Sequence, residues 1–226
     1  MDSISSNLVA RRAFLAGTAA VGILALPGCQ GMGGFSMVEA IRRLLDMSAK
    51  AAFAKLTAPG GFWDSEVARF DLPDMFGTSG PLKTLLLSSA FRQGLQKQLN
   101  VVAEKGAERA APVVYEAVSK ISIPDAISIV RGGSSAATGY LRGQMGQGLV
   151  GAMVPGLSDA LRVTSDPVLG KAIKQLAGID VGQMAQSLAA RADNSIWNQI
   201  GLEEGAIRAN PEATRDPLLI GMFKVL

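Results

Sequence analysis

The chain has 226 residues and a formal net charge of +3, and 48% of its residues are hydrophobic while only 5% are aromatic. The length suits one medium-sized domain, and a composition rich in Ala, Gly and Leu favours closely packed helices over sheets. The sequence contains no histidine and one cysteine, which excludes histidine-based catalysis, nearly all zinc sites and an intramolecular disulfide, and its scattered basic residues do not indicate nucleic-acid binding.

The N-terminal region has the pattern of an export signal. Arg11 and Arg12 precede an uncharged, mostly apolar run at residues 13–26, which is shorter than the roughly 20 residues that span a bilayer. Basic residues before such a run are typical of a secretory signal peptide, and the order Arg-Arg-x-Phe-Leu resembles a twin-arginine export signal. We predict that residues 1–28 are a cleaved signal, with the ordinary export route still open. A short core helix is the structural alternative.

The apolar run ends in Leu26-Pro27-Gly28-Cys29, which resembles the lipobox of bacterial lipoproteins. That resemblance implies cleavage before Cys29 and transfer of a diacylglyceryl group to its thiol. Because each buried acyl CH₂ contributes about 0.8 kcal/mol to membrane affinity, such a cysteine is a firm anchor. Gln30 follows the cysteine, and a residue other than Asp there implies sorting to the outer membrane. We therefore expect an exported protein on the periplasmic face of a bacterial membrane, with residues 29–35 as lipidated cysteine and tether.

Residues 36–226 are predicted to form one compact all-α domain. Ser36 and Glu39 form a capping box that predicts the start of the first helix, and Pro59-Gly60-Gly61 predicts its end. An aromatic-rich loop follows. Pro and Gly then divide the rest into predicted helices at residues 81–105, 113–121 and 124–131, a helix capped by Ser134 or Ser135 that leads into a glycine-rich stretch at residues 139–156, and helices at 167–177, 180–208 and around 218–223.

Five glycine and proline positions carry specific predictions. Gly106 and Pro112 predict a break between two helices, and Pro155 predicts the end or a kink of another. In the glycine-rich stretch, Gly139 and Gly143 lie four residues apart, a spacing that lets another backbone approach closely. Tight helix packing is the favoured interpretation of this stretch.

Two stretches resemble a known family. They are IVRGGSSAATGYLR (residues 129–142) and EEGAIRANP (residues 203–211), the second followed by the pairs at 218–219 and 222–223. Together with Gly61-Phe62 and Leu72-Pro73, they resemble the bacterial family called domain of unknown function 4197 over residues 36–226. The resemblance implies a helical, mostly exported protein that often has a signal or lipoprotein start, and it brings no established activity.

Five charged residues in these stretches are candidate site residues. Glu203 is predicted to lie in the apolar stripe of its helix and Glu204 at the edge of that stripe, and a buried carboxylate needs a partner. Arg208 lies four residues after Glu204, a favourable spacing for an ion pair, and Arg131 or Arg142 is the predicted partner of Glu203. A structural ion pair joining two helices is the favoured interpretation, and a paired-carboxylate site with a raised pKa is the alternative.

The sequence Arg131-Gly-Gly-Ser-Ser allows two interpretations. A glycine turn before a helix can hold an anion at the helix N-terminus. The favoured alternative is a helix stop followed by a cap from Ser134 or Ser135, since the lysine of a phosphate loop is missing.

Three functions remain open at this stage. The favoured one is a non-enzymatic, lipid-anchored helical module for envelope interaction or scaffolding. The second is a carrier that encloses an apolar or lipid-like ligand, and the third is an enzyme that uses Glu203 with an arginine. We expect no cofactor, no metal site and no nucleic-acid partner. The expected partners are the membrane, through Cys29, and an envelope protein or an apolar ligand.

Overall fold

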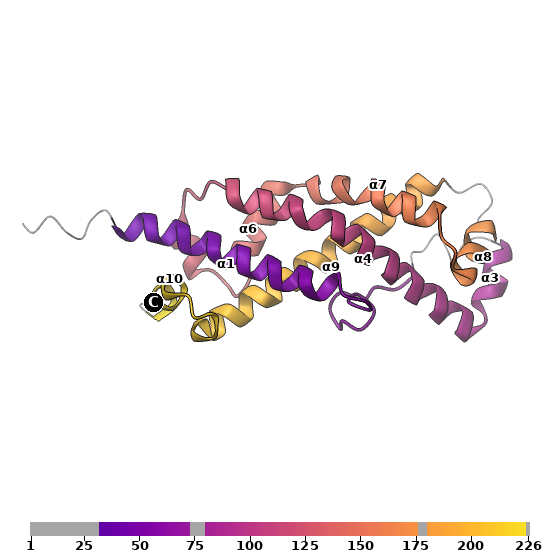
Figure 1. Ribbon diagram of the computed structural model, residues 1–226, viewed down its shortest axis with the longest axis horizontal. Coiled ribbons are helices and arrows are strands. Elements are labelled where there is room, and N and C mark those ends of the chain that lie inside the picture. The colour runs from indigo at the N-terminus through magenta and orange to yellow at the C-terminus, as the bar shows by residue number, and fades with distance from the viewer. Residues whose placement is uncertain (1–31, 73–79, 176–179, 225–226) are drawn as a thin grey trace, which may run out of the picture.

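The computed structural model describes residues 32–72, 80–175 and 180–224 (Figure 1). These ranges contain helices and their connections and no strand, which confirms the predicted all-α class. Arg11, Arg12 and Cys29 lie outside the described residues. The elements are α1 (Met32–Leu56), α3 (Gly80–Leu86), α4 (Ser89–Lys120), α5 (Ala126–Arg131), α6 (Ala136–Met145), α7 (Gly148–Arg162), α8 (Pro167–Gln175), α9 (Val181–Ala209), the 3₁₀ turn η1 (Pro211–Thr214) and α10 (Pro217–Lys224).

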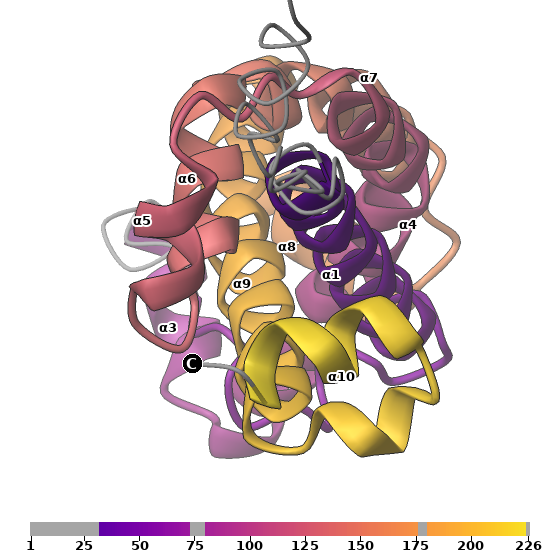
Figure 2. The same ribbon diagram turned by 90° about the vertical axis from the view of Figure 1, so that its left-hand side faces the viewer.

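Four long helices, α1, α4, α7 and α9, form the body of the molecule (Figure 1). Helix α9 packs against α7 and α1, and α4 packs against the same two helices. Helices α3 and α8 lie together at one end, whereas α5 and α10 contact α1 at the end where α1 begins (Figure 2). The fully buried side chains of the core include Ile41, Leu44, Leu45, Phe53, Leu56, Phe62, Leu82, Leu95, Leu149, Leu157, Leu188 and Ile200.

Helix α1 begins earlier than the capping box predicts. It starts at Met32, so residues 32–35 of the predicted tether are helical. Gly33 and Gly34 each disfavour a helix by about 1 kcal/mol relative to Ala, but neither forbids one, and no proline stands in this stretch. Only Gln30 and Gly31 therefore separate Cys29 from the helix.

The predicted break at Gly106 and Pro112 is wrong, because α4 runs through both residues. Pro112 is exposed, so the backbone carbonyl that loses its helical partner can bond water. Gly106 is buried where α7 crosses: a Cβ there would lie 2.9 Å from Cδ2 of Leu157. The actual break comes at residues 87–88, where Ser88 caps α4 by accepting the N–H of Phe91 at 3.4 Å.

The glycine-rich stretch divides into α6 and α7, with Gly146 between them at φ +52°. Pro155 does not end α7; it is exposed inside that helix, as Pro112 is inside α4. The predicted close packing holds for Gly156, where a Cβ would lie 3.0 Å from Cγ of Arg109. It is wrong for Gly139 and Gly143, which have no atom within 4 Å of an added Cβ.

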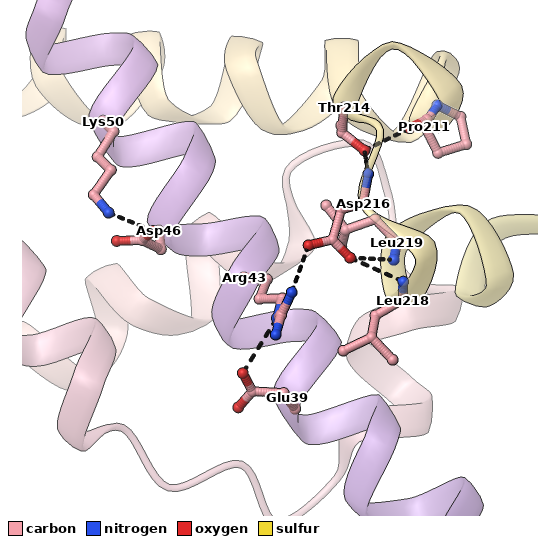
Figure 3. A network of polar contacts seen from close by, with 9 residues as sticks. All are labelled: Glu39, Arg43, Asp46, Lys50, Pro211, Thr214, Asp216, Leu218 and Leu219. Carbon is pink, nitrogen blue, oxygen red and sulfur yellow. Dashed lines mark hydrogen bonds and ion pairs between the residues drawn. The ribbon is translucent and has the colours of Figure 1, made fainter.

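The predicted cap of α9 agrees with the structure, and α10 has a cap of the same kind. Asp180 caps α9 by accepting the N–H of Gly182 at 2.8 Å. At the start of α10, Asp216 accepts the N–H groups of Leu218 and Leu219 and also receives Arg43 of α1 at 2.8 Å (Figure 3). One carboxylate thus caps α10 and ties it to the first half of α1.

Candidate functional site

An open groove of about 500 Å³ lies between α6 and α9. Val67, from the loop after α1, and Leu202 of α9 are exposed apolar side chains in this groove, at 39% and 50% exposure. Polar groups stand between them. The lining residues are Val67, Ser134, Ser135, Thr138, Gly139, Arg142, Trp197, Asn198, Gly201 and Leu202.

The start of α6 rests on two glycines of α9. A Cβ added to Gly201 would lie 3.1 Å from the Cβ of Ser135, and one added to Gly205 would lie 3.5 Å from the Cβ of Ser134. At Gly201 the turn before α6 would have to move by a few tenths of an ångström to admit a Cβ, whereas at Gly205 a Cβ would make an ordinary van der Waals contact. Gly201 therefore sets how closely the turn before α6 packs on α9.

Glu204 of α9 is fully buried and caps α6 from the neighbouring helix. Its carboxylate accepts the N–H groups of Ala137 and Thr138 at 3.0 and 2.7 Å and the hydroxyl of Thr138 at 2.6 Å. A negative group here also interacts favourably with the helix dipole. The predicted helix stop is present, since the N–H of Gly132 donates to a carbonyl of α5. Ser135, however, makes no side-chain cap hydrogen bond.

Arg208 lies one turn further along α9, and its guanidinium hydrogen-bonds to the last carbonyls of α5. Its Nε donates to Glu204 at 2.7 Å, so the predicted pair of these two residues is present. Its terminal nitrogens donate to the carbonyls of Ile129 and Val130 at 3.0 and 2.9 Å. The guanidinium also lies 5.2 Å from the ring centroid of Phe223 in α10. One buried ion pair thus joins α5, α6, α9 and α10.

The predicted arginine partner of Glu203 is wrong. Glu203 accepts from Lys55 of α1 and from Gln199, both at 2.6 Å. The burial of the two glutamates is also the reverse of the prediction, since the side chain of Glu203 is 13% exposed and that of Glu204 is 0% exposed. Residues 188, 192, 196 and 200 of α9 are buried at steps of four, and the next step in that row is Glu204.

Arg142 and Arg131 occupy different surroundings. Arg142 donates to Asp193 of α9 at 2.9 Å and also to Asn194, and it lines the groove. Asp193 accepts the indole N–H of Trp197 at 2.9 Å. Burial raises the pKa of Asp193, and the indole and the guanidinium oppose that rise. Arg131 is exposed on α5, and no described carboxylate pairs with it.

The loop that brings Val67 to the groove is held from two sides. Asn100 of α4 is fully buried and bonds both the N–H and the carbonyl of Phe70, at 3.2 and 3.1 Å. Ser195 of α9 donates to the carbonyl of Ala68 at 2.7 Å. The wall of the groove that carries Val67 is therefore fixed to the helical core.

Glu104 of α4 is a buried carboxylate that sequence reasoning missed. It is 6% exposed, and its Oε1 has no hydrogen-bond partner among the described residues. Burial raises the pKa of Glu104, and the backbone N–H groups of Phe62 and Gly60 oppose the rise. Asn100 and Glu104 lie four residues apart in a row that also contains buried apolar residues. A polar pair at helical spacing, inside the helix predicted at residues 81–105, is the signal that could have found them.

The arginine of the groove is already paired within the described residues. Arg142 and Asp193 already bind one another, and no described hydrogen bond links Ser134 or Ser135 to a base. Within residues 32–72, 80–175 and 180–224, no cluster of three or more His, Cys, Asp or Glu residues could hold a metal ion. None of the described helices has the length and hydropathy required to cross a membrane.

The buried ion pair of Glu204 and Arg208 should contribute more to the free energy of unfolding than the pair of Glu203 and Lys55. Glu204→Gln leaves Arg208 buried without its counter-charge, and we expect the free energy of unfolding to fall by about 3 kcal/mol or more. The neighbouring change Glu203→Gln weakens an ion pair at the surface and should cost less than about 1 kcal/mol. Urea unfolding followed by circular dichroism measures both variants. Equal losses for the two would contradict the structural role of Glu204.

Glu104 should make the protein less stable as the pH rises, whereas a surface ion pair makes a protein less stable as the pH falls. The pKa of Glu104 is raised in the folded state. Its stabilising contribution is therefore present at pH values below its pKa in the unfolded chain, and it is lost as the pH rises through its pKa in the folded protein. Glu104→Gln, which imitates the protonated acid, should therefore unfold at higher urea concentration than the parent at pH 7, with a smaller difference near pH 4.

Glu116→Gln on the same helix provides the control. Lys120 lowers the pKa of Glu116, so this change should destabilise the protein at pH 7 and have no effect at low pH. A Glu104→Gln protein that is less stable than the parent at pH 7 would show that the carboxylate is required in its charged form.

The comparisons with known proteins identify the family and no function. The family model described as "Protein of unknown function (DUF4197)" matches residues 32–224, which is most of the chain. No curated protein and no solved structure matches the chain. The match covers all the helices that the structure describes, including residues 129–142 and 203–211, and the chain belongs to the DUF4197 family.

Proposed function

We propose that this protein is an exported lipoprotein whose helical domain binds an envelope protein through the groove between α6 and α9. The order of Arg11, Arg12, the apolar run and Cys29 supports export and a lipid anchor on the periplasmic face of the outer membrane. The domain itself acts by binding and not by catalysis.

The observation that carries the binding role is the chemistry of the groove. Two apolar side chains, Val67 and Leu202, are exposed in it beside the partly exposed guanidinium of Arg142. The walls are fixed by buried hydrogen bonds, so a partner would meet a preformed surface and lose little free energy in ordering it. An extended segment with an apolar and an acidic side chain complements this lining.

The two alternatives have less support. The groove is open to solvent, whereas a carrier of apolar ligands needs an apolar cavity that covers most of the ligand. An enzyme built on Glu203 and an arginine lacks that geometry, because Glu203 is bonded to Lys55 and Gln199.

Site-specific photo-crosslinking in living cells tests the binding role. With a benzophenone amino acid at position 202, we expect one discrete crosslinked protein band, and the band should weaken when Arg142 is changed to Gln. Position 163 is the matched control, since Val163 is also an exposed apolar residue, at 79%, and lies at the end of α7. Equal crosslinking at positions 202 and 163 would refute the groove as the binding surface. Crosslinks to lipid alone would favour the carrier.

Cell fractionation tests the anchor. Because the acyl chains supply the membrane affinity, Cys29→Ala protein should move from the membrane fraction to the soluble fraction. Replacing Arg11 and Arg12 with Lys should keep the precursor in the cytoplasm if the twin-arginine route is used. Cys29→Ala protein that still sediments with membranes would overturn the lipoprotein assignment.

A further inference from the structure

The end of the molecule at which α1 begins must lie close to the proposed lipid anchor. Helix α1 starts at Met32, so three residue steps connect Cys29 to it. A fully extended chain spans at most about 3.5 Å per residue, which limits this connection to roughly 10 Å. A tether this short keeps the start of α1 close to the membrane surface. This inference rests on the proposed function, through the lipid on Cys29.

The surface at that end is apolar. A shallow groove of about 410 Å³ lies there between the first turns of α1 and the connection from α4 to α5. Ile127 of α5 is 53% exposed at its edge, although its neighbours Ile129 and Val130 are buried. Figure 2 looks onto this end, with α5 and α10 beside the start of α1. We call Met37, Val38, Pro124 and Ile127 the anchor-side patch; Ile123 lies beneath it in the core.

One exposed cation beside the patch, Arg131, suits a surface of lipid phosphates. Arg131 lies four residues after Ile127 on α5, hence on the same side of that helix, and it is exposed without a described carboxylate partner. Lysine and arginine next to apolar side chains favour binding to anionic headgroups. The one carboxylate in the groove, Asp125, is engaged at the N-terminus of α5, where it accepts the N–H of Ser128 at 2.9 Å.

The opposite end of the molecule supplies a natural comparison. Leu87 is 81% exposed just before α4, and Ile123 and Ile127 follow the other end of that helix. Helix α4 has 32 residues, which corresponds to roughly 48 Å at 1.5 Å per residue. Leu87 is therefore far beyond the reach of a three-residue connection, although its side chain is more exposed than that of Ile127.

We propose that the anchor-side patch rests on the phospholipid surface, with Ile127 among the headgroups and Arg131 on lipid phosphate. The lipidated cysteine and the patch then form two adjacent contacts with one bilayer. The long helices extend away from the membrane and carry Leu87 with them.

Depth-dependent quenching on the lipidated full-length protein tests this orientation. The chain has one cysteine, and its sulfur is blocked once it carries the lipid, so a cysteine introduced by Ile127→Cys or Leu87→Cys is the thiol that reacts. Each variant is labelled with the environment-sensitive dye NBD and reconstituted into vesicles of phosphatidylglycerol and phosphatidylcholine. Some vesicles also contain a lipid with a nitroxide at headgroup depth.

We expect the dye at position 127 to shift to shorter wavelength and to lose about half its emission to the quencher, as for a side chain in the headgroup region. The dye at position 87 should do neither. Adding Arg131→Glu to Ile127→Cys should reduce quenching in vesicles rich in phosphatidylglycerol more than in vesicles of phosphatidylcholine alone.

The intact mass of each preparation separates the two proposals. If Cys29 carries the lipid and position 127 is not quenched, or position 87 is quenched instead, the orientation is wrong while the anchor stands. If the mass shows no lipid and Cys29 itself takes up the dye, the anchor fails and this inference fails with it. Quenching at 127 that is insensitive to Arg131→Glu would overturn the phosphate contact.

Discussion

The structure around the groove depends on one buried ion pair, in which Glu204 and Arg208 meet the ends of two other helices. A carboxylate at the first N–H groups of α6 and a guanidinium at the last carbonyls of α5 each satisfy backbone groups that a helix leaves unpaired. The charges have the signs that the two helix dipoles favour. An isolated buried ion pair often contributes little net stability because of desolvation. Here five further hydrogen-bonding groups, from α5 and α6, replace the lost water, so the pair specifies how three helices fit together.

The helical architecture could be predicted from the sequence because it follows from local signals. Asp180 caps α9 as predicted, and the Gly132-Gly133 stop falls between α5 and α6. The helix ends predicted at Pro112 and Pro155 were wrong, because a proline ends a helix only when the freed carbonyl has no other hydrogen-bond partner. Both lie on the solvent side of amphipathic helices, where water replaces the missing N–H. Their tolerance depends on which side faces the core, and that is a tertiary property.

The candidate site was predicted only in part, for the same reason. The spacing of Glu204 and Arg208 predicted their pairing, since a separation of four residues is local. Which glutamate points inward depends on how α9 is rotated against α6, and assigning the stripe one residue away exchanged Glu203 with Glu204. The sequence also did not show which glycines are sites of close packing: Gly201 lies against Ser135, whereas Gly139 and Gly143 face open space. A sequence shows that a backbone can be approached closely but not which element approaches it.

The connection between α5 and α6 links the two surfaces for which we propose functions. Helix α5 carries the anchor-side patch through Ile127, and α6 carries one wall of the groove through Arg142. Both helices are held on α9 by the same ion pair, so neither surface can shift relative to the other without breaking buried hydrogen bonds. A domain that rests on the membrane through α5 would thus hold its groove at a fixed height and direction. For a protein that binds a partner anchored in the same envelope, such fixed geometry restricts which segments can reach the groove, and it adds selectivity that the groove lining alone does not provide.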